Sequence, residues 1–191
     1  MTPFLSDKLL QTVVAGTEKN SDDAHRLFGD LSEDQLNWKP APDRWSIAQC
    51  LDHLAVATDK FGPYLTAAIA RGRAKYPVPS APGYQPSRLG GWLIRQLLPE
   101  STRRVPAPKI FRPTETAPIH GTLAHFLKAQ NEFLGFVRQA EGLDYNKTRL
   151  RSPVTPLMRY SLADAFVITV VHGQRHLGQG QRVREAQGFP K

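Results

Sequence analysis

The stretch His172-Gly173-Gln174-Arg175-His176 decides how this chain is interpreted, because it places two histidines four residues apart in a segment with helical periodicity. Residues four apart lie on one face of a helix, with Cβ atoms roughly 5–6 Å apart, so two such imidazoles can meet one ion. An imidazole in a helical core needs a hydrogen-bond partner or a metal. Both histidines belong to the inward stripe of their segment, which consists of Ala165, Ile168, Thr169, His172, His176, Gln179 and Val183.

Helical periodicity also covers most of the chain outside this stretch. Ser46 with Gln49, and Ser161 with Asp164, have the spacing of capping boxes at the start of two long helices. Pro63 falls inside the earlier of these helices and is expected to kink it. No segment shows the sustained alternation of a strand. Apolar residues recur at helical spacing in four long segments and one short turn, at about residues 5–28, 31–36, 47–71, 119–140 and 162–187.

The positive charge of the chain is concentrated between the second and third long helices. The net charge is +8, and residues 71–112 hold nine lysines and arginines but only one acid, Glu100. The same segment is rich in proline and contains one expected short helix at about 88–98. We therefore predict an all-α, four-helix bundle formed by a single domain, residues 1–191, with a long proline-rich crossover between helices 2 and 3. Residues 72–118 are the irregular basic insertion of this domain.

Composition excludes several classes of protein. No apolar run approaches the roughly 18 residues that a membrane-spanning helix needs, so no transmembrane segment is expected. The N-terminus lacks the charged lead and apolar core of a secretory signal. Cys50 is the single cysteine, which rules out an internal disulfide and is typical of a reducing compartment. We expect a cytoplasmic protein.

His53 is the third candidate ligand, because it lies in the apolar run of the second long helix. Three histidines from two helices would leave coordination positions open, as catalytic metal sites do. Two alternatives remain from the residues alone: His172 and His176 as surface residues of a terminal turn, and His53 as a hydrogen-bonded core histidine. Gly173 stands where a zincin needs glutamate, so that motif is excluded.

The remaining histidines and the cysteine are not expected to contribute to the site. His25, His120 and His125 fall in charged or off-stripe positions, and we expect all three to be solvated. Cys50 precedes His53 by one turn, which puts its thiol within reach of the same ion. A small buried hydrophobic role is the simpler interpretation of this residue.

Two motifs resemble the DinB-like (DinB/YfiT-like) superfamily. They are Trp45-Ser46-Ile47-Ala48-Gln49-Cys50-Leu51-Asp52-His53-Leu54 and His172-Gly173-Gln174-Arg175-His176-Leu177-Gly178-Gln179-Gly180-Gln181-Arg182-Val183. The resemblance implies a four-helix bundle with a three-histidine site for a divalent metal, with His53, His172 and His176 as the ligands. It also implies a homodimer, and an activity related to the thiol-dependent transferases and hydrolase-like enzymes of that superfamily.

The leading hypothesis is a metal-dependent thiol S-transferase or hydrolase that acts on a small substrate, with the basic segment favouring an anionic one. Zinc or nickel is the expected metal, with iron or manganese as alternatives, and a low-molecular-weight thiol is a candidate cosubstrate. Gln49 and Gln179 are candidate partners that orient the ligand rings.

The alternative is a non-catalytic nucleic-acid or acidic-partner binding module that uses residues 71–112, with Trp92 and Tyr84 stacking on bases. No recognised DNA-reading motif is present, so nucleic acid is not the expected partner. In a third hypothesis the histidines serve metal-assisted stability or sensing. The short helix is also a candidate to lie on a membrane surface or a dimer partner, but it is too short to favour a membrane.

Overall fold

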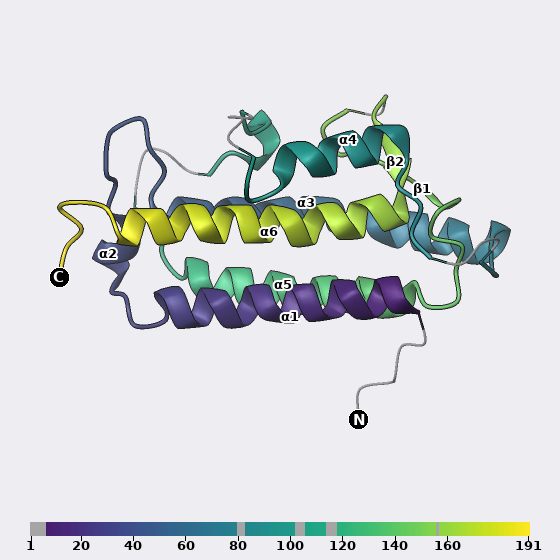
Figure 1. Cartoon of the computed structure of the whole chain (residues 1–191), viewed down its shortest axis with the longest axis horizontal. Coiled ribbons are helices and arrows are strands. Elements are labelled where there is room, and N and C mark those ends of the chain that lie inside the picture. The colour runs from purple at the N-terminus through teal and green to yellow at the C-terminus, as the bar shows by residue number, and fades with distance from the viewer. Residues whose placement is uncertain (1–6, 80–82, 102–105, 114–117, 156) are drawn as a thin grey trace.

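The computed structural model describes residues 7–79, 83–101, 106–113, 118–155 and 157–191. The protein is mostly helical within these residues, with one very small sheet (Figure 1). The helices are α1 (Lys8–Phe28), α2 (Glu33–Asn37), α3 (Ile47–Lys75), α4 (Arg88–Leu97), α5 (Thr122–Gln139) and α6 (Leu162–Arg184). A 3-10 turn η1 (Lys109–Phe111) and two strands, β1 (Arg149–Arg151) and β2 (Arg159–Ser161), complete the described elements.

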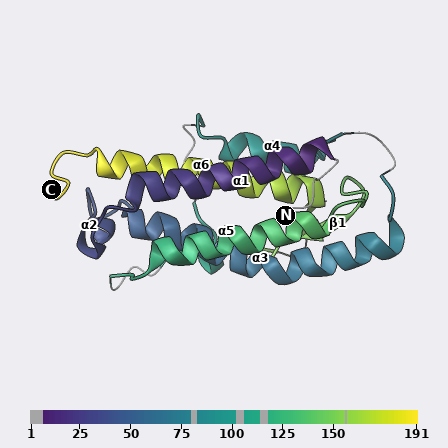
Figure 2. The ribbon, with the colours of Figure 1, turned by 90° about the horizontal axis from the view of Figure 1, so that it is seen from below.

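Four long helices lie side by side and form a bundle along the long axis of the molecule (Figures 1 and 2). Around the bundle, α1 packs against α5 and α6, and α3 packs against the same two helices. The ribbon shows that α1 and α6 run in one direction while α3 and α5 run in the other. The chain therefore has to return along the bundle between the end of α3 and the start of α5, and α4 lies on α6 along this return path.

Helix starts follow the expected capping chemistry. Ser46 Oγ accepts a hydrogen bond from the Gln49 amide at 3.1 Å, and Gln49 Oε1 accepts one from the Ser46 amide at 3.1 Å. Ser161 and Asp164 form the same reciprocal pair at the start of α6, at 3.0 Å in both directions. These contacts satisfy backbone amides that a helix N-terminus otherwise leaves unpaired. Both predicted capping boxes are confirmed.

Helix ends differ from the expected bounds by several residues. The long helix α3 continues through Pro63 and ends at Lys75, beyond the expected end near residue 71. Pro63 lies on the exposed side of the helix, where water can satisfy the carbonyl that its missing N–H leaves unpaired. The last helix ends at Arg184 instead of near 187. The expected start of the first helix at residue 5 lies outside the described residues.

A short antiparallel hairpin between α5 and α6 was not predicted from the sequence. Leu150 pairs with Tyr160, and Arg151 pairs with Arg159, in the register of β1 and β2. Leu150 and Tyr160 are buried in the core, at 0% and 2% exposure. Each strand has only three residues, so alternation between an apolar and a polar face is too brief to stand out in a sequence.

Two apolar clusters fill the bundle, one toward each end. One cluster contains Leu10, Phe133 and Phe166, and the other contains Phe28 and Phe126. Along each helix, buried or partly buried polar residues fall between the members of the two clusters: Asn20 on α1, Thr58 on α3, Gln130 on α5 and His172 on α6. The interior of the bundle is therefore polar near the middle of its length, between the two apolar clusters.

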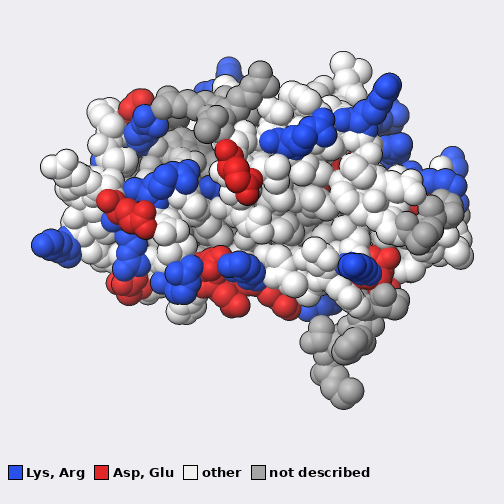
Figure 3. Space-filling model, in the orientation of Figure 1, with Lys and Arg blue, Asp and Glu red and all other residues white. Residues whose placement is uncertain are grey.

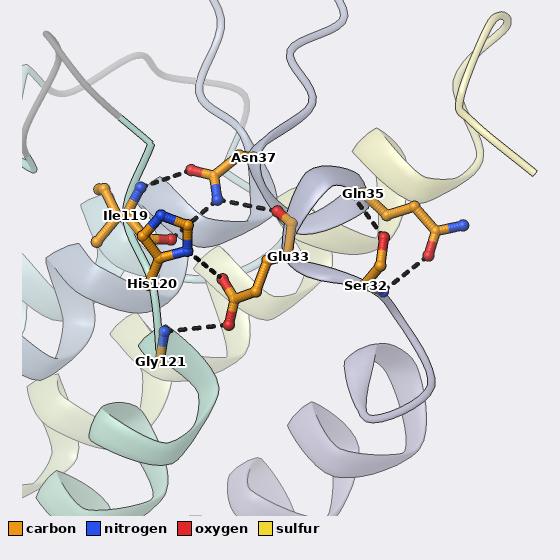
Figure 4. Close-up of polar contacts among 7 residues, drawn as sticks. All are labelled: Ser32, Glu33, Gln35, Asn37, Ile119, His120 and Gly121. Carbon is orange, nitrogen blue, oxygen red and sulfur yellow. Dashed lines mark hydrogen bonds and ion pairs between the residues drawn. The ribbon is translucent and has the colours of Figure 1, made fainter.

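The short helix α2 closes one end of the bundle by bonding to the lead-in of α5 (Figure 4). Asn37 Oδ1 accepts from the Ile119 amide at 2.8 Å, while its Nδ2 donates to the Ile119 carbonyl at 2.9 Å. Glu33 Oε1 accepts from the Gly121 amide at 3.1 Å. Gly121 has a φ of 64°, a conformation that favours glycine at this turn. The contacts determine where α5 begins.

No helix in the described part of the chain combines the length and hydrophobicity needed to cross a bilayer.

Candidate metal centre

The packing of α3 against α6 brings three histidines together in the middle of the bundle. His53 comes from α3, and His172 and His176 come from successive turns of α6. The centroid of the His53 ring lies 4.9 Å from that of the His172 ring and 4.7 Å from that of the His176 ring. The two α6 rings are 4.7 Å apart, and one nitrogen from each of the three rings lies within 4.8 Å of the others. Among the described residues, no other group of three potential ligands is this close.

The distance between ring nitrogens is suited to a metal ion. His53 Nε2 lies 3.1 Å from His172 Nε2. Ligand nitrogens of a tetrahedral zinc site, with Zn–N bonds of 2.0–2.1 Å, are about 3.3 Å apart. The two imidazoles therefore have nearly the separation of ligands on a common ion.

The backbone of η1 orients the His53 ring. His53 Nδ1 lies 2.6 Å from the carbonyl oxygen of Phe111. A carbonyl can only accept, so Nδ1 carries the proton and, in the neutral ring, Nε2 presents its lone pair toward His172. Histidine ligands of metals usually donate their other ring N–H in this way. The contact defines both the tautomer and the direction of His53.

Burial keeps all three imidazoles neutral. It lowers the pKa of His172 to about 3, with smaller contributions from the neighbouring His53 and the Arg175 cation. Burial also lowers the pKa of His176 well below its ordinary value, and a side-chain hydrogen bond with Gln179, a predicted partner of the ligand rings, opposes this shift. The pKa of His53 is lowered by burial and raised in part by the Phe111 carbonyl. Neutral imidazole is the form that binds metals, so a metal would not have to displace protons near pH 7.

His176 carries the clearest sign of a missing partner. Its Nδ1 atom is buried and has no hydrogen-bond partner among the described residues. Buried polar groups in proteins are almost always satisfied, so a ring nitrogen without a partner beside two other imidazoles fits a set of ligands for a cation. The indole of Trp45 stacks on the His176 ring at 5.6 Å and 25° and lies 5.0 Å from the His53 ring. Trp45 forms an apolar wall of the site.

Besides Trp45, two contributors to the site were not predicted from the sequence. One is the Phe111 carbonyl, for which no sequence signal exists because any residue has a carbonyl. The other is Arg175, whose Nη1 donates to the carbonyls of Leu98 and Ser101 at 2.9 and 2.8 Å. This arginine lies inside the histidine motif and could have been suspected from that position. These bonds join the backbone just beyond α4 to the turn of α6 that carries His172 and His176.

The other sequence candidates lie elsewhere or have another role. The Gln49 side chain accepts from the Ser46 amide in the capping box. Cys50 is buried, and burial raises the pKa of its thiol to about 12, as expected for a small core residue. His125 contacts Asp59 at 2.8 Å on the bundle surface, and the His120 side chain is 71% exposed near Glu33. His25 is also exposed, so the three remaining histidines are outside the site, as predicted.

Comparison with known proteins assigns the chain to a family. The sequence model of the DinB superfamily matches residues 17–179, so the chain belongs to the DinB superfamily. The structure is similar to that of YfiT from Bacillus subtilis, with a TM-score of 0.59 and 13% identity over 100% of this chain and 94% of that one. YfiT is described as "a probable metal-dependent hydrolase with an unusual four-helix bundle topology". No match was found among curated proteins.

Proposed function

We propose that His53, His172 and His176 bind one divalent transition metal ion and that the protein is a metal-dependent hydrolase. The observation that carries this proposal is the convergence of three neutral imidazoles from two helices on one point in the bundle. Three protein ligands leave a coordination position for a reactant, as in catalytic zinc sites. The description of YfiT as a metal-dependent hydrolase supports the same reaction class.

Each residue around the proposed ion has a distinct task. The metal would supply Lewis acidity, which makes a water molecule or a thiol nucleophilic near neutral pH. The Phe111 carbonyl holds His53 in the ligand tautomer, and Trp45 shields one side of the histidines from water. Arg175 places a positive charge near the ligands, which favours a small anionic substrate.

Thiol S-transfer is the second candidate reaction for the same site, and it would need an external thiol. The chain has a single cysteine, Cys50, which is buried with a pKa raised to about 12. A buried thiol of that pKa is not a nucleophile at neutral pH. The cosubstrate of a transfer reaction would therefore be a low-molecular-weight thiol.

The remaining functional inferences follow from the family. We infer zinc or nickel as the metal, with iron or manganese as alternatives, because imidazole ligands suit several of these ions. We also infer one domain over residues 1–191, with a proline-rich crossover at 72–118, that works as a homodimer in the cytoplasm. The extent of the family match, residues 17–179, supports the single domain.

Metal content, measured by mass spectrometry of freshly purified protein, tests the proposal. We expect near-stoichiometric transition metal in the parent and none in a His172→Ala/His176→Ala variant that retains its helical circular dichroism. His125→Ala removes a surface histidine and should keep the metal. Trace metal in all three proteins, unchanged after reloading with Zn²⁺ or Ni²⁺, would refute a metal site.

Reaction screens then separate the two candidate chemistries. The metal-loaded parent should hydrolyse members of an ester, amide and phosphoester panel without added thiol. Turnover that appears only with a low-molecular-weight thiol would assign S-transfer instead. Turnover that survives in the double-histidine variant would place the reaction outside this site.

A further inference from the structure

The outer face of the β1–β2 hairpin carries three arginines. Arg149, Arg151 and Arg159 are exposed, while Leu150 and Tyr160 between them point into the core. Successive residues of a strand point to opposite faces, so burial of the two apolar residues turns all three arginines outward. The hairpin thereby presents a small sheet face whose charged groups all have the same sign.

Two of these arginines are paired directly across the hairpin. Arg151 lies opposite Arg159, and the amide of Ser152 donates to the Met158 carbonyl at the next position. The Arg151–Arg159 pair is therefore a non-hydrogen-bonded pair, whose side chains approach each other most closely. Like charges opposite each other destabilise a sheet unless an anion lies between them. The hairpin retains a repulsion that a bound anionic group would relieve.

No acidic side chain compensates this charge within the described residues. None of the three arginines takes part in an ion pair in the described part of the chain. Asp144 and Asp164, which flank the hairpin in sequence, are buried at 3% and 0% exposure. Their carboxylates accept hydrogen bonds inside the fold. The arginines are thus available to an external anion.

Helix α4 extends the cationic surface, since it packs beside β2. Arg88, Trp92 and Arg95 are exposed and recur at helical spacing on its outer side. With Pro86 and Gly91 they line a shallow groove. In Figure 3, lysine and arginine side chains gather over α4 and the hairpin end of the molecule, whereas along α1 acidic and basic side chains are interspersed. Arg103 and Arg104, also part of the basic segment, lie outside the described residues.

Exposed apolar side chains lie on the same elements, in the hairpin loop and on α4. In the loop that joins β1 to β2, Leu157 is 93% exposed and Val154 is 40% exposed. Trp92 on α4 is 46% exposed. Leucine and tryptophan exposed among arginines are typical of surfaces that rest in the headgroup region of a bilayer.

We propose that the outer face of the hairpin, together with α4, docks on the surface of a membrane that contains anionic phospholipids. The guanidinium groups bind headgroup phosphates, and Leu157 and Val154 enter the boundary between headgroups and acyl chains. Docking of this kind places the protein on the membrane surface, and no helix in its described residues is long and apolar enough to cross a bilayer. Docking uses no ligand of the metal centre, so it is independent of the proposed reaction.

The side-chain arrangement favours a bilayer over single-stranded nucleic acid as the anionic partner. Base stacking requires exposed rings next to the cations. The Tyr84 hydroxyl donates to buried Asp164 at 2.7 Å, so this ring is held in the fold and not offered to a base. Trp92 remains as the exposed ring of α4. An exposed leucine at the tip has a role in a lipid surface and none against a phosphate backbone.

Cosedimentation with lipid vesicles tests the proposal. The metal-loaded full chain should bind vesicles of phosphatidylcholine mixed with phosphatidylglycerol, and binding should weaken as salt is raised. It should not bind vesicles of phosphatidylcholine alone. Each arginine near an anionic surface contributes about fivefold in partitioning, so Arg149→Gln/Arg151→Gln/Arg159→Gln should lower binding by about a hundredfold.

Charge-matched and apolar variants sharpen the outcome. Lys19→Gln/Arg26→Gln/Lys128→Gln removes three exposed cations from α1 and α5, on the other side of the bundle, and should leave vesicle binding within about twofold of the parent. Leu157→Ser should weaken binding about tenfold, because one buried leucine is lost from the boundary region.

Three outcomes would overturn the proposal. They are no binding to either kind of vesicle, equal loss in the two charge variants, and salt-dependent binding of single-stranded DNA without binding to vesicles. The last would assign the surface to nucleic acid. Metal content of the arginine variant should match the parent, which separates a failure of docking from a failure of the metal centre.

Discussion

Gly173 lies between the two histidines of α6 and has no space for a side chain. A Cβ atom there would collide with the amide of Asn20 on α1, which is buried and donates to the Val170 carbonyl at 3.0 Å. The close approach of α1 and α6 at this level depends on glycine. Gly173 also stands where a zincin needs glutamate, so the packing of α1 on α6 accounts for the glycine at this position of the histidine motif.

Gly173→Ala is expected to lower the free energy of unfolding by about 1–3 kcal/mol, because overpacking forces Asn20 or the helices to move. Gly178→Ala is the matched control on the same helix, where an added Cβ meets only Arg182 Nη1 at an ordinary 3.6 Å. Alanine is the better helix former, so the control should be neutral or up to about 1 kcal/mol more stable. Urea unfolding measures both, and equal effects would contradict this account.

The histidine pKa values predict that the metal-free protein loses stability in mild acid. The pKa of His172 falls from 6.5 to about 3 on folding, so below pH 6.5 the unfolded chain binds a proton that the folded chain does not. The contribution of the neutral His172 imidazole to the free energy of unfolding is fully present above pH 6.5 and is lost as the pH falls toward 3. The loss approaches about 1.4 kcal/mol per pH unit as a ceiling. Solvent reaches part of the ring, so the observed loss should be smaller.

Urea midpoints of the chelator-treated protein at pH 7 and pH 5 test this expectation. The parent should lose stability between these values. His172→Gln should lose less, since one titrating group is gone. A parent stability that does not change over this range would show that the imidazoles are not held neutral by burial.

At the scale of elements, the Asn37 side chain of α2 makes two of the hydrogen bonds that connect α2 to the segment leading into α5. Asn37 accepts from and donates to the backbone of Ile119, and both contacts are visible in Figure 4. Asn37→Asp keeps the acceptor but replaces the donor with a carboxylate facing a carbonyl. We expect a loss of about 1–3 kcal/mol in the free energy of unfolding.

Asn131→Asp is the control for this substitution, since Asn131 is an exposed residue of α5. It should change stability by no more than about 0.5 kcal/mol. Chemical denaturation gives both values. If the two substitutions had equal effects, the hydrogen bonds of Asn37 with the Ile119 backbone would not contribute to stability.

The elements themselves differ in how far local sequence predicted them. Two helix starts were predicted from capping boxes, Ser46 with Gln49 and Ser161 with Asp164. A capping box can be recognised locally because it is a contact between residues three apart. The hairpin was missed because its pairing of Leu150 with Tyr160 joins residues whose only common signal is burial in the assembled core. Only this pairing shows that the three arginines of the hairpin lie on the same outward face.

At the scale of the whole molecule, a bound ion would link α3 to α6 and stabilise the bundle. A ligand at a hundred times its Kd stabilises the folded state by about 2.7 kcal/mol, which in a chain of this size raises the unfolding temperature by about 5–10 °C. We expect such a rise on adding Zn²⁺ to metal-free parent and His125→Ala, measured by calorimetry. His53→Ala should show little rise, and a full rise in that variant would contradict the proposed ligand set.

The sequence by itself determined that the chain is helical, where two of its helices begin, and that His172 and His176 share a face, because each depends on contacts within one helix. It also determined the family, through motifs on the second and last long helices. Only the tertiary structure decided that His53 meets the α6 pair, that a Phe111 carbonyl orients it, and that Arg151 faces Arg159. Those contacts join residues far apart in the chain, and their geometry depends on how helices pack and where a carbonyl points, which residue types do not encode locally.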